Sequence, residues 1–162
     1  MAAYLFIEGI EGQSVDADHK NWINLLSVSE GMSRPVSFGG SGSSRNTSSV
    51  THSDVSVVKE ADKSTPKLIE AVNSGTTLAT VKIDLVQSLG DKAKRLPYLQ
   101  WELKNVLVTS YSISATGDGG VPPTESLSFN FEEAKWIYTQ YSKEGKNEGK
   151  VETTWKVEEG ST

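Results

Sequence analysis

Apolar side chains recur at every second position over most of the chain, and this alternation limits the folds that it can adopt. Leu99, Trp101 and Leu103 are spaced in this way, as are Leu127 and Phe129. Successive side chains of a β-strand point to opposite faces, so the pattern indicates strands that are buried on one side. The segments that we expect to be strands are residues 4–8, 22–29, 52–59, 78–86, 98–104, 106–113, 125–131, 136–141 and 151–157.

Two of these strands carry a further expectation about their faces. In the strand 22–29, the alternation places Trp22, Leu26 and Val28 on one face. Ile23 and Leu25 then lie on the opposite face. The alternation changes phase near Asn105, between the strands 98–104 and 106–113, which suggests a β-bulge.

Only one segment has the signals of a helix. Ser64 or Thr65 can supply the N-cap oxygen, and Pro66 suits the first turn. An apolar stripe of Leu68, Ile69 and Val72 follows, and Gly75 suits a left-handed C-cap. The sequence therefore predicts a mainly β fold: a compact antiparallel β-barrel or sandwich of about eight strands with one short flanking α-helix.

A Gly/Ser-rich segment at about residues 38–50 interrupts the strands. It is nearly free of apolar side chains, so burial does not offset the entropy of ordering it, and we expect a mobile loop or a hairpin arm. Only about 37 residues precede it, too few for an independent core. The chain, residues 1–162, is therefore interpreted as one domain, and a loop this long is usually functional.

Charge and composition exclude several classes of function. The formal net charge is −5 and the pI is about 5.1, which argues against nucleic-acid binding and against docking on an anionic membrane. The chain has no cysteine, so disulfides and thiolate chemistry are excluded. The first residues have no features of a cleavable signal peptide, and no segment has the roughly 20 apolar residues needed to cross a bilayer.

Two histidine-containing segments invite a site interpretation that the residue types do not support. Asp16, Asp18 and His19 resemble a metal cluster, but their spacing matches no metal motif, so a solvated turn is the preferred interpretation. His52 and Asp54 lie near many serines, but no Gly-x-Ser-x-Gly elbow is present. We expect them to lead into a strand.

Two other patterns are also interpreted as structural. The stretch from Gly39 to Gly42 lacks the Gly-Lys-Ser/Thr ending of a phosphate-binding loop. Glu132 and Glu133 are adjacent, so on a strand they point to opposite faces and do not converge on one bond. The sequence thus predicts no catalytic residue, no metal site and no cofactor, although a hydrolase that uses such carboxylates is kept as a third alternative.

Tryptophans at alternating positions are expected to be buried, with one exception. Trp136 and Tyr138 lie on a strand that also has Ile137 and Tyr141 on its opposite face. A strand that is apolar on both faces is either central in a sandwich or covered by a neighbouring subunit. We therefore place a subunit interface at Trp136 and Tyr138. The alternative is a carbohydrate-binding β-sandwich, in which exposed aromatic side chains stack on sugars.

Five stretches, in order and over nearly the whole chain, resemble the hemolysin-coregulated protein (Hcp) family, the tube protein of type VI secretion. They are residues 4–14, 19–33, 62–68 with Ser74 and Gly75, 98–111, and 123–131 with 136–138. The Asp-Lys-Ser-Thr-Pro stretch and the Leu-Lys-Asn-Val-Leu-Val-Thr-Ser stretch are the most specific. Val28 and Glu30 depart from the family pattern, in which aromatic residues are common at these positions.

The resemblance implies a structural protein that is not an enzyme. Six copies would close into a ring, and rings would stack into a hollow tube that carries small effector proteins in its lumen. The partners would be other copies of the chain and the sheath, spike and baseplate proteins. The protein would be made in the bacterial cytoplasm and secreted into the extracellular space or into target cells without a cleavable signal peptide.

The resemblance also implies roles for particular residues. Ser29 would line the lumen and contact cargo. The outer helix face, Lys67, Glu70 and Asn73, would meet the sheath. The ring-stacking loop would consist of the Gly/Ser-rich segment, with the residues Phe38, Gly39, Gly40, Ser41, Gly42, Arg45, Asn46 and Val50.

Overall fold

The computed structural model describes residues 2–39, 45–89 and 94–158, and in this part of the chain it contains thirteen β-strands and one α-helix. The elements are β1 (Ala2–Ile7), β2 (Ile23–Leu25), β3 (Ser27–Ser29), β4 (Met32–Ser33), β5 (Val36–Phe38), β6 (Arg45–Thr47), β7 (Thr51–His52), β8 (Val55–Glu60), α1 (Thr65–Ser74), β9 (Leu78–Leu89), β10 (Lys94–Ser114), β11 (Thr124–Asn130), β12 (Glu133–Tyr141) and β13 (Asn147–Lys156). The mainly β class, the antiparallel pairing and the single helix are confirmed. The number of strands exceeds eight because short strands build a hairpin arm and the expected strands 22–29 and 52–59 are each broken in two. The expected strands 98–104 and 106–113 are instead one continuous strand, β10.

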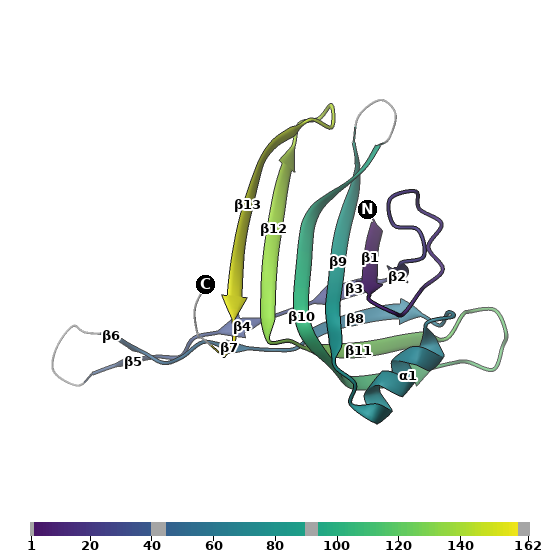
Figure 1. Cartoon of the computed structure of the whole chain (residues 1–162), viewed down its shortest axis with the longest axis horizontal. Helices are drawn as coiled ribbons and strands as arrows, with labels where there is room; N and C mark the ends of the chain where they lie inside the picture. The colour runs from purple at the N-terminus through teal and green to yellow at the C-terminus, as the bar shows by residue number, and fades with distance from the viewer. Residues whose placement is uncertain (1, 40–44, 90–93, 159–162) are drawn as a thin grey trace.

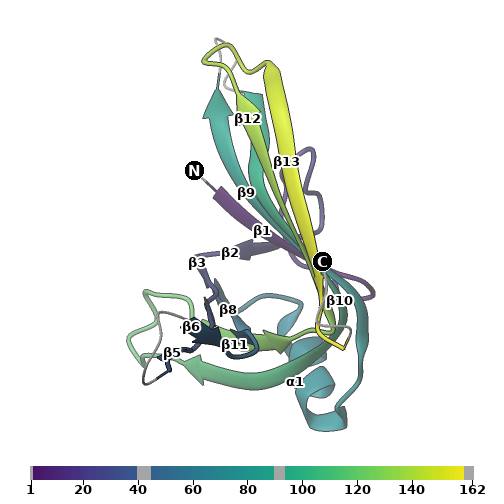
Figure 2. The ribbon, with the colours of Figure 1, turned by 90° about the vertical axis from the view of Figure 1, so that its left-hand side faces the viewer.

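The strands form two layers that meet at an angle (Figures 1 and 2). A single hydrogen-bonded ladder runs in the order β2, β1, β9, β10, β11, β8, β3, and β12 and β13 extend it from β10. Every pair in this ladder is antiparallel. The arrangement is sandwich-like, because the apolar faces of the two layers enclose one core.

Strand β10 belongs to both layers. Its first part pairs with β9 and β12, and its last part, from Leu107 onward, pairs with β11. Between the parts, Asn105 has a φ of 50°, a left-handed backbone that reverses which residues face the core. Leu103 and Val106, three residues apart, are therefore both fully buried. The predicted change of phase is confirmed, but its cause is this residue; the register shift between β10 and β11 lies between Val108 and Ser110.

The predicted continuous strand 22–29 is wrong, because the chain changes layer at Leu26. β2 pairs with β1 in one layer, and β3 pairs with β8 in the other. The Leu26 amide donates a hydrogen bond of 2.7 Å to the Val58 carbonyl at this corner, and its side chain is 59% exposed. Leu26 therefore does not share a buried face with Val28. Ile23 and Leu25 do lie in the core.

Helix α1 covers one end of the core with Leu68 and Ala71. Gly75 has a φ of 63°, as expected of a left-handed C-cap. Ser64 is the N-cap residue, which is one of the two predicted positions, but its side chain makes no capping hydrogen bond, so the predicted capping oxygen is wrong. The Ser64 hydroxyl instead donates a hydrogen bond to the Asp62 carboxylate, and the Thr65 hydroxyl accepts one from the Asp62 amide.

A buried ion pair lies where this helix meets the strands. Lys59 of β8 and Glu125 of β11 are fully buried, and Lys59 Nζ lies 2.5 Å from Glu125 Oε2 and 3.0 Å from Asp62 Oδ1. The Tyr111 hydroxyl donates a hydrogen bond of 2.6 Å to Glu125 Oε1. Burial, together with the neighbouring Glu125, raises the pKa of Tyr111 to about 12. The network thus joins β8, β10, β11 and the residues before α1.

Substituting Lys59 by Met should destabilise the protein strongly. It leaves the Glu125 carboxylate buried without a counter-ion, a change that costs about 3–5 kcal/mol. The double variant Lys59→Met/Glu125→Leu removes both charges and should regain part of the loss. Lys67→Met, which removes an exposed ion pair with Glu70, is the control and should cost no more than about 1 kcal/mol. Urea unfolding measures all three, and equal midpoints for Lys59→Met and Lys67→Met would contradict the prediction.

Candidate assembly surfaces

A two-stranded arm projects from the body of the molecule (Figure 1). β4 and β7 pair at its base, and β5 and β6 pair farther out. This settles the choice between a mobile loop and a hairpin arm for the described residues of the segment 38–50. Gly39 is exposed, Val50 is half-buried at the base of the arm, and Gly40, Ser41 and Gly42 lie outside the described residues.

The arm has one apolar, cationic face and one polar face. Phe38 pairs with Arg45, and Val36 pairs with Thr47, so these four side chains share a face. Ser37 and Asn46 form the opposite pair. All six residues are exposed, and Phe38 is 80% exposed. A large aromatic side chain on an arm without a covering layer marks a surface that another chain can bury.

Glu30, just before the arm, accepts hydrogen bonds from two tryptophans. The indole N–H groups of Trp101 and Trp136 donate hydrogen bonds of 2.7 and 2.8 Å to Glu30 Oε2. A carboxylate that accepts two N–H groups in a partly buried place is held by charge-assisted bonds. Glu30 Oε1 is also buried, and it has no hydrogen-bond partner among the described residues.

His52 fixes the other strand of the arm base. The centroid of its ring lies 6.0 Å from that of Trp136 and 5.6 Å from that of Trp155, and it makes a T-shaped contact with Phe131 at 6.0 Å. Both ring nitrogens are buried without a partner among the described residues. His52 therefore packs as an aromatic side chain, and it lines two hollows beside the arm of about 720 and 470 Å³.

An apolar strip continues the core face of the larger layer beyond the part that the second layer covers. Leu85, Leu99, Tyr138 and Val151 stand in register across β9, β10, β12 and β13. Leu85 and Leu99 are half-buried against the core, whereas Tyr138 is 50% and Val151 is 74% exposed. Trp136 is half-buried on the same face, with its N–H group already bonded to Glu30.

The strip ends at a free strand edge. Within the described ranges, β13 pairs with β12 and with no other strand. Its residues are mostly exposed, and the edge carries unpaired backbone groups along the same side as the exposed end of the strip. A long free edge beside apolar side chains is a place where a further strand or subunit can add.

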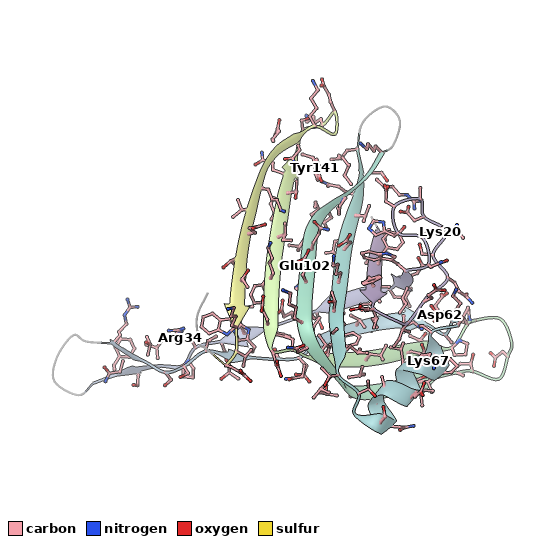
Figure 3. The ribbon with its side chains drawn as sticks, viewed as in Figure 1. Lys20, Arg34, Asp62, Lys67, Glu102 and Tyr141 are labelled. Carbon is pink, nitrogen blue, oxygen red and sulfur yellow. The ribbon has the colours of Figure 1, made fainter. Side chains whose placement is uncertain are left out.

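Ser29 lies just before the arm base, and the outer helix face lies on α1. Ser29 ends β3, is exposed, and pairs with Ser56 of β8. Lys67, Glu70 and Asn73 are exposed on α1, where Lys67 and Glu70 form an ion pair of 2.9 Å; Figure 3 labels Lys67. The structure thus brings Trp136 and Tyr138 together on β12 and places Ser29 near the arm base.

His19 does not belong to a solvated turn, and that prediction is wrong. It is 3% exposed, and its Nδ1 and Nε2 each lie 2.9 Å from a carboxylate oxygen, of Asp16 and Asp84 respectively. The ring also stacks on Tyr4 at 4.4 Å. Burial acts to raise the pKa of Asp16, but hydrogen bonds from His19 and Arg95 outweigh it and hold that pKa below its ordinary value.

The remaining polar side chains that could suggest chemistry have structural partners. Asp54 accepts hydrogen bonds from Thr109 and Asn130, and Glu132 accepts one from Asn105. In the described part of the chain, no group of three or more His, Cys, Asp or Glu side chains is placed to hold a metal ion. The described residues also include no helix with the length and apolar character needed to cross a membrane.

Sequence reasoning missed Glu30 and the packing role of His52. The signal at Glu30 was its departure from an aromatic position, which became meaningful only with Trp101 and Trp136 in place. His52 gave no signal, because a histidine two residues from an aspartate in a Ser-rich segment does not reveal three aromatic neighbours far along the chain.

Comparisons with known proteins agree with this architecture. The sequence model of the family described as "Type VI secretion system effector, Hcp" matches residues 4–138. Protein hcp1 of Pseudomonas aeruginosa is 33% identical over 161 residues, which cover 97% of this chain and 96% of that protein.

Solved structures give the same result. A structure described as a type six secretion system protein superposes with a TM-score of 0.90 at 25% identity and covers 99% of this chain and 98% of its own. Hcp1 from Salmonella typhimurium has the same fold, with a TM-score of 0.77 at 23% identity, over 98% of this chain and 95% of its own. The chain belongs to the Hcp family of type VI secretion system effectors.

Proposed function

We propose that this protein is the structural tube subunit of a type VI secretion system. Six copies form a ring, the rings stack into a hollow tube, and the lumen carries small effector proteins. The tube contacts the sheath, spike and baseplate proteins and is secreted from the bacterial cytoplasm. The family is a structural, secreted tube protein and not an enzyme, which supports this assignment.

The observation that carries the proposal is the apolar strip beside the free edge of β13. Tyr138 and Val151 are the exposed end of a row whose other members pack against the core. Apolar surface next to an unpaired strand edge gains free energy when a second chain covers it. This surface offers both exposed apolar side chains and the backbone groups of a strand edge.

The position of this surface favours a closed ring. The free edge of β13 and the arm lie on one side of the molecule, and β1, β2 and α1 lie on the other (Figure 1). When one side of a subunit contacts a different side of the next, the contact repeats and closes into a ring if the rotation fits. Each subunit then contributes its β13 side to one neighbour.

The other surfaces have roles outside the ring contact. The apolar face of the arm, with Phe38, contacts a neighbouring ring. Ser29 lines the lumen, where a small hydroxyl holds cargo without a large apolar contact. The outer face of α1, with Lys67, Glu70 and Asn73, meets the sheath.

A carbohydrate-binding role has less support. An aromatic platform for sugars needs exposed ring faces. Trp101 is 8% exposed, and the N–H groups of Trp101 and Trp136 are already bonded to Glu30. Glycan affinity of a monomeric protein would nevertheless be the result that favours this alternative.

Charged residues in the apolar strip should prevent ring formation. We expect Tyr138→Lys/Val151→Lys to remain monomeric, because burying an unpaired ammonium group is unfavourable. Light scattering after size exclusion, with negative-stain images of the same peak, measures this against the ring of the parent protein. Val121→Lys is the matched control, since Val121 is 69% exposed in a loop. A parent protein that stays monomeric at all concentrations would contradict the tube assignment.

A charge on the apolar face of the arm should block stacking and leave the ring intact. Phe38→Asp places a carboxylate where we expect an aromatic contact with the next ring. Electron micrographs should show single rings in place of tubes, while the mass of the ring in solution stays unchanged. Ser37→Asp puts the same charge on the opposite face of the arm and should stack normally. Equal stacking of both variants would rule out the assigned face.

Substitutions at Ser29 and on α1 should separate cargo retention from sheath contact. Ser29→Arg should reduce the amount of effector that copurifies with intact rings, because a large cation changes the lumen surface. Lys67→Glu should leave effector retention unchanged and reduce secretion from cells, since it reverses a charge on the outer helix face. Each variant is the control of the other, and a single phenotype shared by both would contradict the two assignments.

A further inference from the structure

Glu30 lies where the chain leaves the body of the molecule and begins the arm. β3 ends at Ser29, and β4, the first strand of the arm base, begins at Met32. Any side chain that anchors residue 30 therefore acts on the root of the arm. A two-stranded ribbon is weakly stable on its own, so its direction depends on such contacts at its base.

The anchor consists of one carboxylate oxygen and two indole groups from different strands. Trp101 belongs to β10 and Trp136 to β12, which are paired directly at these two residues. Both N–H groups donate to Glu30 Oε2, so the carboxylate lies astride two strands of the larger layer. A side chain without an acceptor atom at this position would leave both indole N–H groups without this partner.

Trp136 also holds the returning strand of the arm. His52 of β7 is paired with Met32 of β4, and its ring is stacked on Trp136 with an interplanar angle of 21°. One tryptophan thus contacts both sides of the arm base, through its N–H group on one side and its ring face on the other. The same tryptophan lies in the strand that carries Tyr138, two residues farther along β12.

We propose that Glu30 is a positioning residue that fixes the direction of the arm relative to the β12–β13 surface. The Glu30 carboxylate anchors the first strand of the arm base, and the packing of His52 on Trp136 holds the second strand. The anchoring itself does not depend on the proposed function. Its consequence for assembly does: an arm with a fixed direction meets the next ring in register. Loss of the carboxylate leaves the β12–β13 surface in place and frees the arm.

The first experiment measures how Glu30 anchors the arm base in the purified protein, and it can be done in any oligomeric state. Glu30→Ala should shift the indole N–H signals of Trp101 and Trp136 in a ¹H–¹⁵N spectrum, because both lose their acceptor. Amide exchange at Met32, Ser33 and residues 51–53 should become at least about tenfold faster through local opening of the arm base. Glu30→Gln keeps one acceptor oxygen and should show an intermediate effect.

Two further variants keep the test independent of a general loss of stability. Trp136→Phe removes one donor and keeps an aromatic ring against His52, so it should speed exchange at Met32 in the same way. Glu60→Ala removes an exposed carboxylate at the end of β8 and should change neither the indole signals nor the exchange rates. Unchanged exchange in the arm base of Glu30→Ala and Trp136→Phe would overturn the proposal.

The second experiment tests the consequence for assembly. Rings of Glu30→Ala and Glu30→Gln should have the mass of parent rings by light scattering, and their stacks should be shorter in negative-stain images. Faster exchange with stacks of parent length would overturn the link between arm direction and stacking. If the parent protein forms no rings, the proposed function fails, and the exchange and indole measurements still decide whether Glu30 positions the arm.

Discussion

The whole arrangement depends on one strand passing through both layers. β10 is 21 residues long, pairs with β9 and β12 over its first part, and pairs with β11 over its last part. A strand that passes from one layer to another needs a bend or an irregularity where it does so. Asn105 supplies that irregularity with a left-handed backbone, so that Leu103 and Val106 both enter the core. Its side chain donates to Glu132, next to the start of β12.

The sequence predicted those parts of the fold that depend on local pattern. Alternation located β1, β8, β9, β11 and β12, and the phase change at Asn105 was visible without coordinates. The corner at Leu26 could not be predicted, because the sequence alternates in the same way whether a segment stays in one layer or crosses to another. The arm was recognised as a break, but its pairing could not be derived from a composition that lacks apolar alternation.

The buried polar groups were beyond sequence reasoning for a different reason. Lys59 and Glu125 are 66 residues apart, and His19 and Asp84 are 65 apart. Charged residues are normally assigned to the surface, since burying them is unfavourable unless they are paired. The pairing appears only when distant strands are placed side by side. Of the assembly surfaces, Tyr138 was foreseen as a place of exposed apolar surface, whereas Glu30 needed two tryptophans from two other strands.

The two assembly surfaces share a single side chain. Trp136 stands between the core rows and the exposed row of Tyr138 and Val151, and its N–H group and ring face hold both strands of the arm base. In the proposed ring, a neighbour that covers Tyr138 would contact the strand that carries this tryptophan. Because packed side chains move between discrete arrangements, a shift of Trp136 changes the support of Glu30 and His52 together. The three unpaired buried atoms, Glu30 Oε1 and the two His52 nitrogens, lie at this joint. In the proposed assembly, the side chain that supports both strands of the arm base therefore lies next to the surface that a neighbouring subunit would cover.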